Sequence, residues 1–287
     1  MTDYGDEEDV GNIISLEHIN VQIPDQAIAT LFYVVGMGFT RDPYLNVGLN
    51  NMWVNAGEQQ FHLPTRPAQV IDGHVGVVMP DLNALKARLE AIAAALQGTS
   101  FAHSVQADHV AVTSPWGNRY RCYENRPDFG DMTLGIPYVE FHVEPGATPG
   151  ILRFYQTAFK ALAAVEADSE GPLGRVKIGR QQSLIFRETK KELAPYDGHH
   201  IAIYVANFSA PYGFLKSRGL ISEDVRNHQF RFKDIVDPDD GRTKFVLEHE
   251  VRSLKHPMYA RPFVNRDAAQ TQRAYRRGWD AFTPFQR

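Results

Sequence analysis

The sequence predicts an α+β fold in which four copies of one βαβββ unit are paired into two half-open barrels. The main observation is an internal repeat. The segment Gly57–His62, which is followed by Asp72-Gly73-His74, matches the segment Gly179–Leu184, which is followed by Asp197–His200. A helix-like stretch with a Phe-Tyr pair precedes each copy, and a Pro/Gly turn with a glutamate seven residues past its glycine follows each copy. Such a repeat indicates a fold assembled from copies of one supersecondary unit.

The first two units are predicted from the alternation of apolar residues and from helix signals between the strands. In the first unit, residues 16–23 alternate as a strand, Pro24-Asp25 begins a helix that runs through Val35, and strands follow at 40–44, 51–55 and 59–63. In the second unit, a strand at 74–79 leads into a helix that begins at Pro80-Asp81 and ends at Gly98, and strands follow at 101–107, 109–114 and 118–124. Both units have the same order of elements.

The third unit (138–188) and the fourth unit (200–250) repeat the beginning of this pattern. Strands are predicted at 138–143 and 200–205, and helices at 149–161 and 211–218. One such unit cannot bury its sheet alone, so we expect consecutive units to pair into two domains, 13–124 and 136–250. We expect a linker at 125–135, an acidic disordered N-terminus at 1–12 and an irregular tail at 251–287.

The composition narrows the class of protein. Hydrophobic residues make up 43% and charged residues 22% of the 287 residues, as in ordinary globular proteins. The net charge of −4 gives no basic field for nucleic acid, and no apolar run approaches the roughly 20 residues that a membrane span needs. Cys122 is the only cysteine, and the acidic N-terminus lacks the order of a signal peptide, so we expect a cytoplasmic protein with a small-molecule substrate. A homodimer is compatible with these features.

Several segments carry a family resemblance. They are Glu17–Asp25, Gly73–Asp81 and His199–Val205 at the starts of units, and the turns Ser114–Asn118 and Asp237-Pro238-Asp239. Over roughly residues 13–250 the chain resembles the vicinal oxygen chelate superfamily, which includes glyoxalase I, the bleomycin-resistance proteins and the type I extradiol dioxygenases. A single chain of four units is most similar to the extradiol dioxygenases, in which the C-terminal pair of units holds Fe(II).

The resemblance implies metal ligands at the start of the first strand in two paired units and on the last strand of one of them. Carried onto the C-terminal pair, this pattern gives His200 and Glu248, with His142 or Glu140 as the third ligand. Carried onto the N-terminal pair, it gives the alternative set of His18, His74 and Glu124. Which pair is active stays open.

Two positions depart from the pattern of the family. In the third unit, the residue in register with His18, His74 and His200 is Tyr138. In the second unit, Arg121 stands where the family often has its glutamate. These departures keep open a third interpretation, a metal-free small-molecule binding or resistance protein.

Two imidazoles and one carboxylate on one face of a six-coordinate ion leave three open positions. We expect Fe(II), with Mn(II), Ni(II) or Zn(II) as alternatives. The first hypothesis is an extradiol-type dioxygenase that acts with dioxygen on a small oxygenated substrate, aromatic substrates included. The second hypothesis is a non-oxidative lyase or isomerase of the glyoxalase type, in which the ion acts as a Lewis acid while a glutamate moves a proton.

Further candidates for the site come from histidines, tyrosines and a glutamine near these positions. We expect acid–base or hydrogen-bonding roles in catalysis for three residues: His199, His228 and Tyr138. We expect substrate contacts from three others: His62, Gln60 and Tyr196.

Overall fold

Each of the four predicted repeats folds as a strand, a helical segment and three strands in the computed structural model, which describes residues 9–42, 50–225 and 227–261. The first repeat contains β1 (Ile13–Asn20), α1 (Gln26–Ala29), the π-helical segment η2 (Thr30–Gly36), β2 (Thr40–Arg41), β3 (Asn51–Ala56) and β4 (Gln59–Pro64). The second contains β5 (Gly73–Val78), α2 (Leu82–Ala93), the 3₁₀ turn η3 (Ala94–Leu96), β6 (Ala102–Val105), β7 (Val110–Thr113) and β8 (Arg119–Tyr123).

A 3₁₀ turn, η4 (Pro127–Phe129), leads from the second repeat to the third. The third repeat contains β9 (Gly135–Val143), α3 (Thr148–Phe159), β10 (Ala163–Asp168), β11 (Gly171–Lys177) and β12 (Ser183–Glu188). The fourth contains β13 (His200–Val205), α4 (Ser209–Lys216), β14 (Ile221–Val225), β15 (Gln229–Val236) and β16 (Thr243–Ser253). The predicted α+β fold of four βαβββ units is therefore confirmed.

The aspartates of the two Pro-Asp signals begin their helices as predicted. The Asp25 carboxylate accepts hydrogen bonds from the backbone N–H groups of Ala27 and Ile28, and Asp81 does the same for Ala84. These bonds satisfy N–H groups that have no partner inside the helix. The two helices therefore start a few residues after the first strands of their repeats, β1 and β5. These two strands lie at the centres of the sheets.

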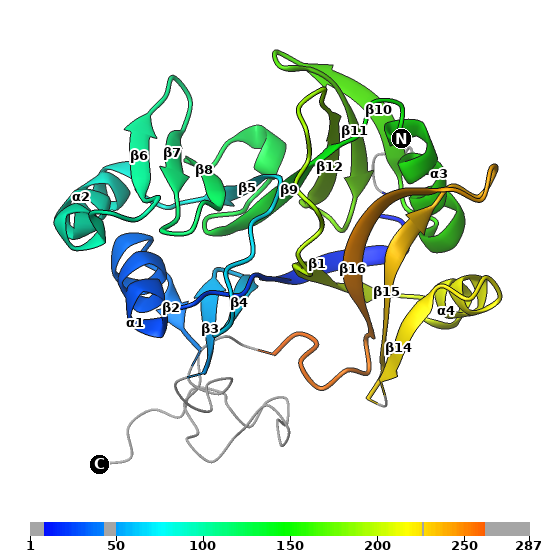
Figure 1. Ribbon diagram of the computed structural model, residues 1–287. Coiled ribbons are helices and arrows are strands. Elements are labelled where there is room, and N and C mark those ends of the chain that lie inside the picture. Colours follow the sequence, from blue (N-terminus) through cyan, green and yellow to red (C-terminus); the bar gives the residue numbers. More distant parts are fainter. Residues whose placement is uncertain (1–8, 43–49, 226, 262–287) are drawn as a thin grey trace, which may run out of the picture.

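The strands form two open eight-stranded sheets (Figure 1). The first has the order β14-β15-β16-β13-β1-β4-β3-β2, and the second has the order β10-β11-β12-β9-β5-β8-β7-β6. At the centre of the first sheet β1 pairs antiparallel with β13, and at the centre of the second β5 pairs antiparallel with β9. The sheets are open at both ends, as half-open barrels require.

The expected pairing of consecutive repeats within a sheet is wrong. The first repeat shares its sheet with the fourth, and the second shares its sheet with the third. The sheets thus run across the division into 13–124 and 136–250. A first strand needs a neighbour on both edges to satisfy its backbone groups, and β9, which follows β8 after a short connection, supplies that neighbour to β5. The first and fourth repeats then complete each other.

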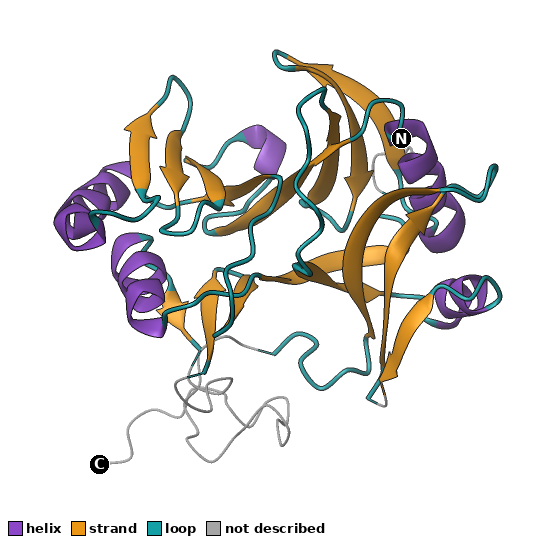
Figure 2. Ribbon diagram, viewed as in Figure 1, coloured by secondary structure: helices purple, strands orange, loops and turns teal. Residues whose placement is uncertain are grey.

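Consecutive repeats meet through their helices instead. Figures 1 and 2 show α1 beside α2 at one end of the molecule and α3 beside α4 at the other. The hydroxyls of Tyr33 in η2 and Tyr120 in β8 lie 2.8 Å apart in the buried core, and the Tyr155 hydroxyl in α3 lies 2.7 Å from Nε2 of His249 in β16. The helices thus pack against one face of each sheet, and polar residues can occupy the opposite face.

Some expectations fall outside the described residues: the disorder of residues 1–8, part of the strand at 40–44 and the tail beyond 261. Within the described ranges, none of the helices is both long and apolar enough to cross a membrane.

Candidate metal centre

Four neighbouring strands of the first sheet, β4, β1, β13 and β16, place polar side chains on one face. Pairing is parallel between β4 and β1, antiparallel between β1 and β13, and parallel between β13 and β16. Residues two apart on a strand share a face. Two adjacent rows therefore cross the sheet, the first made of His62, Asn20, His200 and Glu248, and the second of Gln60, His18, Ala202 and Glu250.

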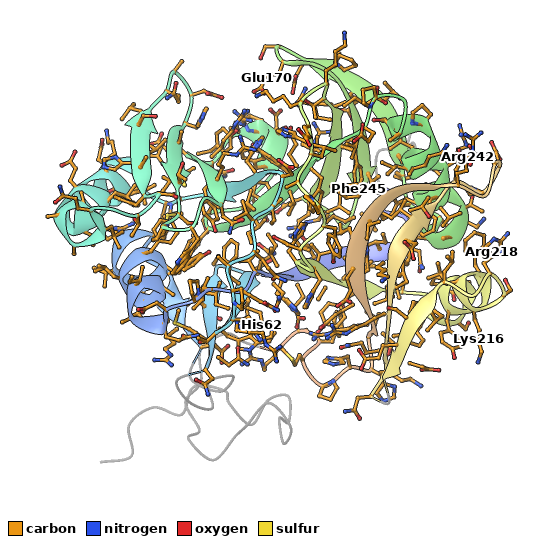
Figure 3. The ribbon with its side chains drawn as sticks, in the orientation of Figure 1. His62, Glu170, Lys216, Arg218, Arg242 and Phe245 are labelled. Carbon is orange, nitrogen blue, oxygen red and sulfur yellow. The ribbon has the colours of Figure 1, made fainter. Side chains whose placement is uncertain are left out.

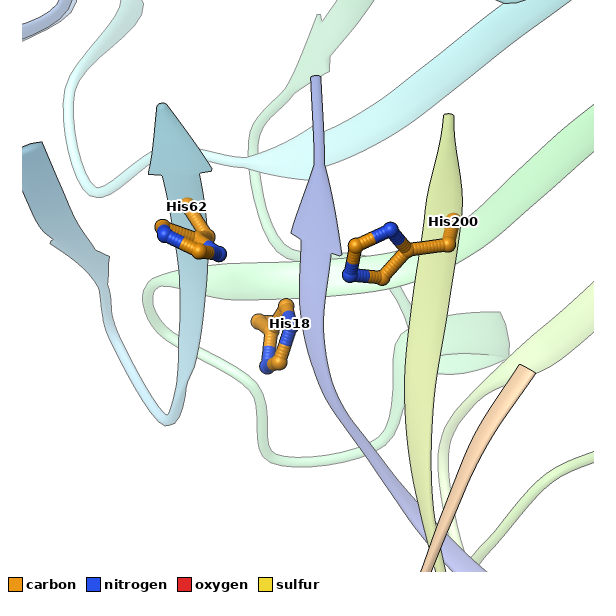
Figure 4. Close-up of side chains that lie close together, drawn as sticks. All are labelled: His18, His62 and His200. Atoms are coloured by element: carbon orange, nitrogen blue, oxygen red, sulfur yellow. The ribbon is translucent and has the colours of Figure 1, made fainter. Parts of the chain in front are cut away.

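Three imidazoles converge on this face. Figure 4 shows the rings of His18, His62 and His200 turned toward a common space from β1, β4 and β13. One nitrogen from each ring lies within 4.8 Å of the nitrogens of the other two. The Nε2 atoms of all three are buried and have no hydrogen-bond partner. Because buried polar atoms normally have partners, three such nitrogens in one cluster are suited to bind a metal ion.

Glu17 fixes the orientation of the His18 ring. The Oε2 atom of Glu17 lies 3.0 Å from Nδ1 of His18, so Nδ1 carries the proton and Nε2 is left as a lone-pair donor. Neighbouring strand residues normally point to opposite faces, but a bulge between Leu16 and His18 breaks the alternation and lets Glu17 reach its neighbour. The hydroxyl of Tyr204 donates to the other oxygen of Glu17 at 2.9 Å.

The charge of Glu17 is kept by its surroundings. Burial alone would raise the pKa of Glu17, but the guanidinium of Arg252 and the His18 ring outweigh it and lower the pKa to about 2. Arg252 is itself buried and donates to Glu17. Glu17 is therefore an anion at neutral pH and can hold the proton on the far side of the His18 ring.

Two of the three imidazoles, those of His18 and His62, are held neutral, as metal ligands must be. Burial lowers the pKa of His18 below its ordinary value. Burial lowers the pKa of His62 further, and repulsion from His18 and His200 adds to the effect. Trp53 stacks on His62 with ring centroids 3.9 Å apart and meets His18 edge-on, so the indole fixes both rings.

Glu250 supplies a carboxylate beside the three rings. Its Oε1 lies 3.3 Å from Nε2 of His200, and its Oε2 lies 3.9 Å from Nε2 of His18. Arg252 donates to Oε2 at 2.6 Å, and Arg231 donates to Oε1. Although burial would raise the pKa of Glu250, these charges and the His200 ring hold it well below its usual range. The group is an anion that can serve as a fourth donor.

A cavity of about 840 Å³ opens onto this centre. Its walls include His62, His200, Glu248, Arg231 and Asn20. Arg231 also donates to Glu248 at 2.5 Å, so one guanidinium joins the two glutamates of β16. A small polar molecule in the cavity therefore meets imidazoles, a carboxylate and a guanidinium at once.

The donor set fits a divalent transition-metal ion. The residues that would hold it are His18, His62 and His200, with Glu250 next to them. Three imidazoles and one carboxylate suit Fe(II), Ni(II), Zn(II) or Mn(II) better than Ca²⁺ or Mg²⁺, which prefer oxygen ligands only.

The predicted C-terminal ligand set is divided between the two sheets. His200 and Glu248 lie in the first sheet, whereas Glu140 and His142 lie on β9 in the second sheet and line other cavities. The set is divided because the fourth repeat shares its sheet with the first repeat and not with the third. His200 therefore has His18 and His62 as neighbours.

The alternative N-terminal set is divided in the same way. His18 lies in the first sheet, and His74 lies on β5 in the second. Glu124 follows β8 and is exposed. His74 instead lies 3.5 Å from Glu140 across the β5–β9 ladder and 3.0 Å from the hydroxyl of Tyr138.

The predicted catalytic residues are scattered over the molecule. His199 is buried, stacks on Phe141 and lies 2.7 Å from Asp197. His228 is exposed in the turn between β14 and β15 and lines a different cavity. Tyr138 lies in the second sheet. None of the three belongs to the histidine cluster.

The predicted substrate contacts lie nearer to the centre. His62 belongs to the cluster itself. Gln60 shares its face but is buried, and it donates to Asp42 at 2.8 Å and Asn55 at 2.6 Å. Tyr196 donates to the backbone of His199 at 2.5 Å and accepts from the backbone N–H of Glu248 at 3.0 Å. Sequence reasoning missed Glu17, whose position depends on the bulge.

Comparison with known proteins agrees with this fold. The sequence matches no family model and no curated protein. Among solved structures, glyoxalase I from Zea mays superimposes with a TM-score of 0.56 at 12% identity, covering 83% of this chain and 92% of that chain. A structure titled "putative dioxygenase" from Bacillus subtilis superimposes with a TM-score of 0.58 at 13% identity, covering 92% of this chain and 90% of that chain. At these identities the likeness shows the fold, and the chain therefore has the vicinal oxygen chelate fold that the sequence predicted.

Proposed function

We propose that the chain is a metal-dependent enzyme whose ion is held by His18, His62 and His200. The observation that carries the proposal is the convergence of three imidazoles whose buried Nε2 atoms make no hydrogen bond. Glu17 supports it, because a carboxylate that holds the far nitrogen of a histidine is the usual partner of a metal-ligating imidazole.

An ion held by these three imidazoles would supply Lewis acidity or one-electron chemistry to a substrate with two adjacent oxygens and to dioxygen. The leading function is therefore a dioxygenase acting on a small substrate with vicinal oxygens, with Fe(II) as the expected ion. Both oxygen atoms would end in the product, so the reaction needs no external reductant.

The residues around the cavity have separable tasks. Arg231 offers a positive charge to an anionic substrate, and Asn20 offers hydrogen bonds from the row between His62 and His200. Glu248 is the group best placed to move a proton, since it lines the cavity, is about a quarter exposed and lies 3.6 Å from Nδ1 of His200. The buried Trp53 ring stacks on His62 and covers one face of that imidazole.

A second candidate is a non-oxidative isomerase or lyase of the glyoxalase type. The position of Glu250 favours it, because a fourth protein donor would leave only two positions, enough for the substrate oxygens alone. Glu248 would then remove a proton from the carbon next to a substrate carbonyl.

The metal is tested first. Protein purified without chelators is expected to hold about one Fe, Mn, Ni or Zn per chain, and His200→Ala and His18→Ala are expected to lose it. His74→Ala is the matched control, because it removes the histidine that occupies the equivalent place in the other sheet. Metal loss in the His74→Ala variant alone refutes the proposal and moves the metal site to the second sheet. A wild type that binds none of these ions on titration also refutes it, and leaves the metal-free binding protein.

The two reactions are then separated with the loaded protein. A dioxygenase consumes dioxygen when given catechols, and EDTA stops the consumption. An isomerase or lyase instead exchanges the α-proton of a hydroxyketone with D2O, which proton NMR detects. In either case Glu248→Gln is expected to lower kcat while the metal content stays unchanged.

A further inference from the structure

The second sheet repeats the geometry of the metal centre with different side chains. In the first sheet, Asn20 pairs with His62 on one side and with His200 on the other. In the second sheet, Gly76 stands in the place of Asn20 and pairs with Arg121 on one side and with Tyr138 on the other. Arg121 therefore occupies the position of His62, and Tyr138 occupies the position of His200.

The remaining two positions complete the comparison. His74 lies two residues before Gly76, as His18 lies two residues before Asn20. Ile185 pairs with Glu140 at the place where Glu250 pairs with Ala202 in the first sheet. A histidine is kept, but the other three donors are replaced by an arginine, a tyrosine and an isoleucine. We call the surface around His74, Arg121, Tyr138, Glu140 and Ile185 the second cup, and the face of the first sheet that carries the histidine cluster the first cup. The second cup keeps one of the three imidazoles of the first.

The replaced side chains form a binding surface of another kind. The Tyr138 ring lies over Gly76, where a Cβ atom would come within 2.4 Å of the ring. Its hydroxyl lies 3.0 Å from Nε2 of His74 and 2.7 Å from the hydroxyl of Tyr123. Tyr138, Tyr123 and Ile185 belong to one buried apolar cluster. One wall of the cup is thus aromatic and apolar.

The positive charge in this cup has a replaceable partner. The guanidinium of Arg121 donates to Glu170 at 2.6 Å, and the two side chains are 29% and 44% exposed. Glu170 stands in the turn between β10 and β11, at the edge of the second sheet (Figure 3). By contrast, the guanidinium of Arg187 is largely buried, and it donates to the buried carboxylate of Glu140 at 3.1 Å and to Asp168 at 2.6 Å.

Cavities lie on both sides of the Arg121–Glu170 contact. One measures about 560 Å³ and the other about 670 Å³, and both are lined by Arg121 and Glu170 together with His74 and Glu140. The larger one also contacts Tyr138 and Ile185. A carboxylate that took the place of Glu170 on Arg121 would carry its attached group into a space of small-molecule size.

We propose that the second cup binds a small aromatic carboxylate without a metal ion, with Arg121 holding the carboxylate and Tyr138 and Ile185 contacting the ring. A guanidinium that presents parallel N–H groups matches a carboxylate in geometry and charge. In the free protein Glu170 occupies that position as a competing carboxylate of the chain itself.

The test is calorimetric titration of the full chain with benzoate in the presence of excess EDTA, with benzamide as the uncharged control ligand. Benzoate is expected to bind and benzamide is not. Arg121→Gln is expected to weaken benzoate binding at least about tenfold, because a charged hydrogen-bond partner is lost. Glu170→Gln is expected to strengthen binding by up to about fivefold, the range of an exposed ion pair.

Arg218→Gln is the matched control, since Arg218 is an exposed arginine in the turn after α4, and it packs on Phe214 away from both cups (Figure 3). It is expected to bind benzoate as the wild type does. Equal binding by wild type and Arg121→Gln overturns the proposal, as does the absence of binding by wild type and Glu170→Gln. Binding that occurs only without EDTA and disappears in His200→Ala belongs to the first cup and also overturns it, while it leaves the metal centre supported.

Discussion

Replacing Glu17 by glutamine is expected to weaken metal binding although no ligand is removed. In the wild type, the carboxylate holds the Nδ1 proton of His18 at 3.0 Å, and this leaves Nε2 free for the ion. A neutral amide of the same shape polarises the ring less and can also present its NH2 group to Nδ1, which favours the wrong tautomer. Loss of such a partner weakens metal affinity by about 10- to 100-fold, which is about 1 to 3 kcal/mol.

The same change also disturbs a buried ion pair, and this effect must be separated from metal binding. Arg252 is 4% exposed and donates to both Glu17 and Glu250. Removing one partner of a buried pair typically costs about 3–5 kcal/mol of folding free energy. Tyr204→Phe is the matched control, because it removes one hydrogen bond to Glu17 but keeps the charge. Its metal affinity is expected to stay within about threefold of the wild type.

The assay is a competition titration of Co(II) or Zn(II) against a chromophoric chelator. It is performed on variants whose folding has been verified by circular dichroism and urea unfolding. The reasoning is refuted if Glu17→Gln binds the ion within threefold of the wild type. It is also refuted if Tyr204→Phe loses as much affinity as Glu17→Gln, because the carboxylate would then have no special part.

Three further predictions concern the fold, the second sheet and the metal. Gly57→Ala would place a Cβ atom 1.8 Å from a backbone carbonyl oxygen. Urea unfolding should therefore show a loss of folding free energy well beyond the roughly 1–2 kcal/mol that positive φ alone costs. Gly98→Ala measures that baseline, because Gly98 has a φ of +85 and a Cβ atom there would meet nothing within 4 Å. Burial alone would raise the pKa of Glu140, but hydrogen bonds, including those from Arg187, lower the pKa to about 2. About 3 kcal/mol of folding stability should therefore be lost as the pH falls from 4.5 to about 2. Glu140→Gln should remove that part of the acid dependence when urea midpoints are measured against pH. His62→Ala should fold but lose its ion on dialysis, and a full metal content after dialysis would exclude this residue as a ligand.

Much of the fold could be predicted from the sequence because its signals are local. The Pro-Asp pairs at 24–25 and 80–81 begin helices through carboxylates that cap their own first turn. The pairing of repeats is not local. Ile19 in β1 and Ile201 in β13 point into the core whichever repeat lies beside their strand. The apolar alternation is therefore the same whether the first repeat pairs with the second or with the fourth.

The three histidines of the candidate site could each be selected from the sequence, but their position in one cluster could not be predicted. His18, His62 and His200 each stand out in the sequence, and only the pairing of β1 with β13 brings them to one place. Glu17 could not be predicted, because a residue next to His18 on a regular strand points to the opposite face. The bulge that changes this leaves no mark in the residue types.

The sharing of one sheet by the first and fourth repeats sets the order in which the protein can mature on the ribosome. His18 is translated 182 residues before His200. At about 5–20 residues per second, the nascent chain therefore waits roughly 10–40 s before a partner for β1 exists. During that interval the open edge of β1 is a surface on which other chains can pair. If His18, His62 and His200 hold an ion as proposed, the full set of ligands exists only after β13 has been made, and a chain that ends before β13 lacks one of the three.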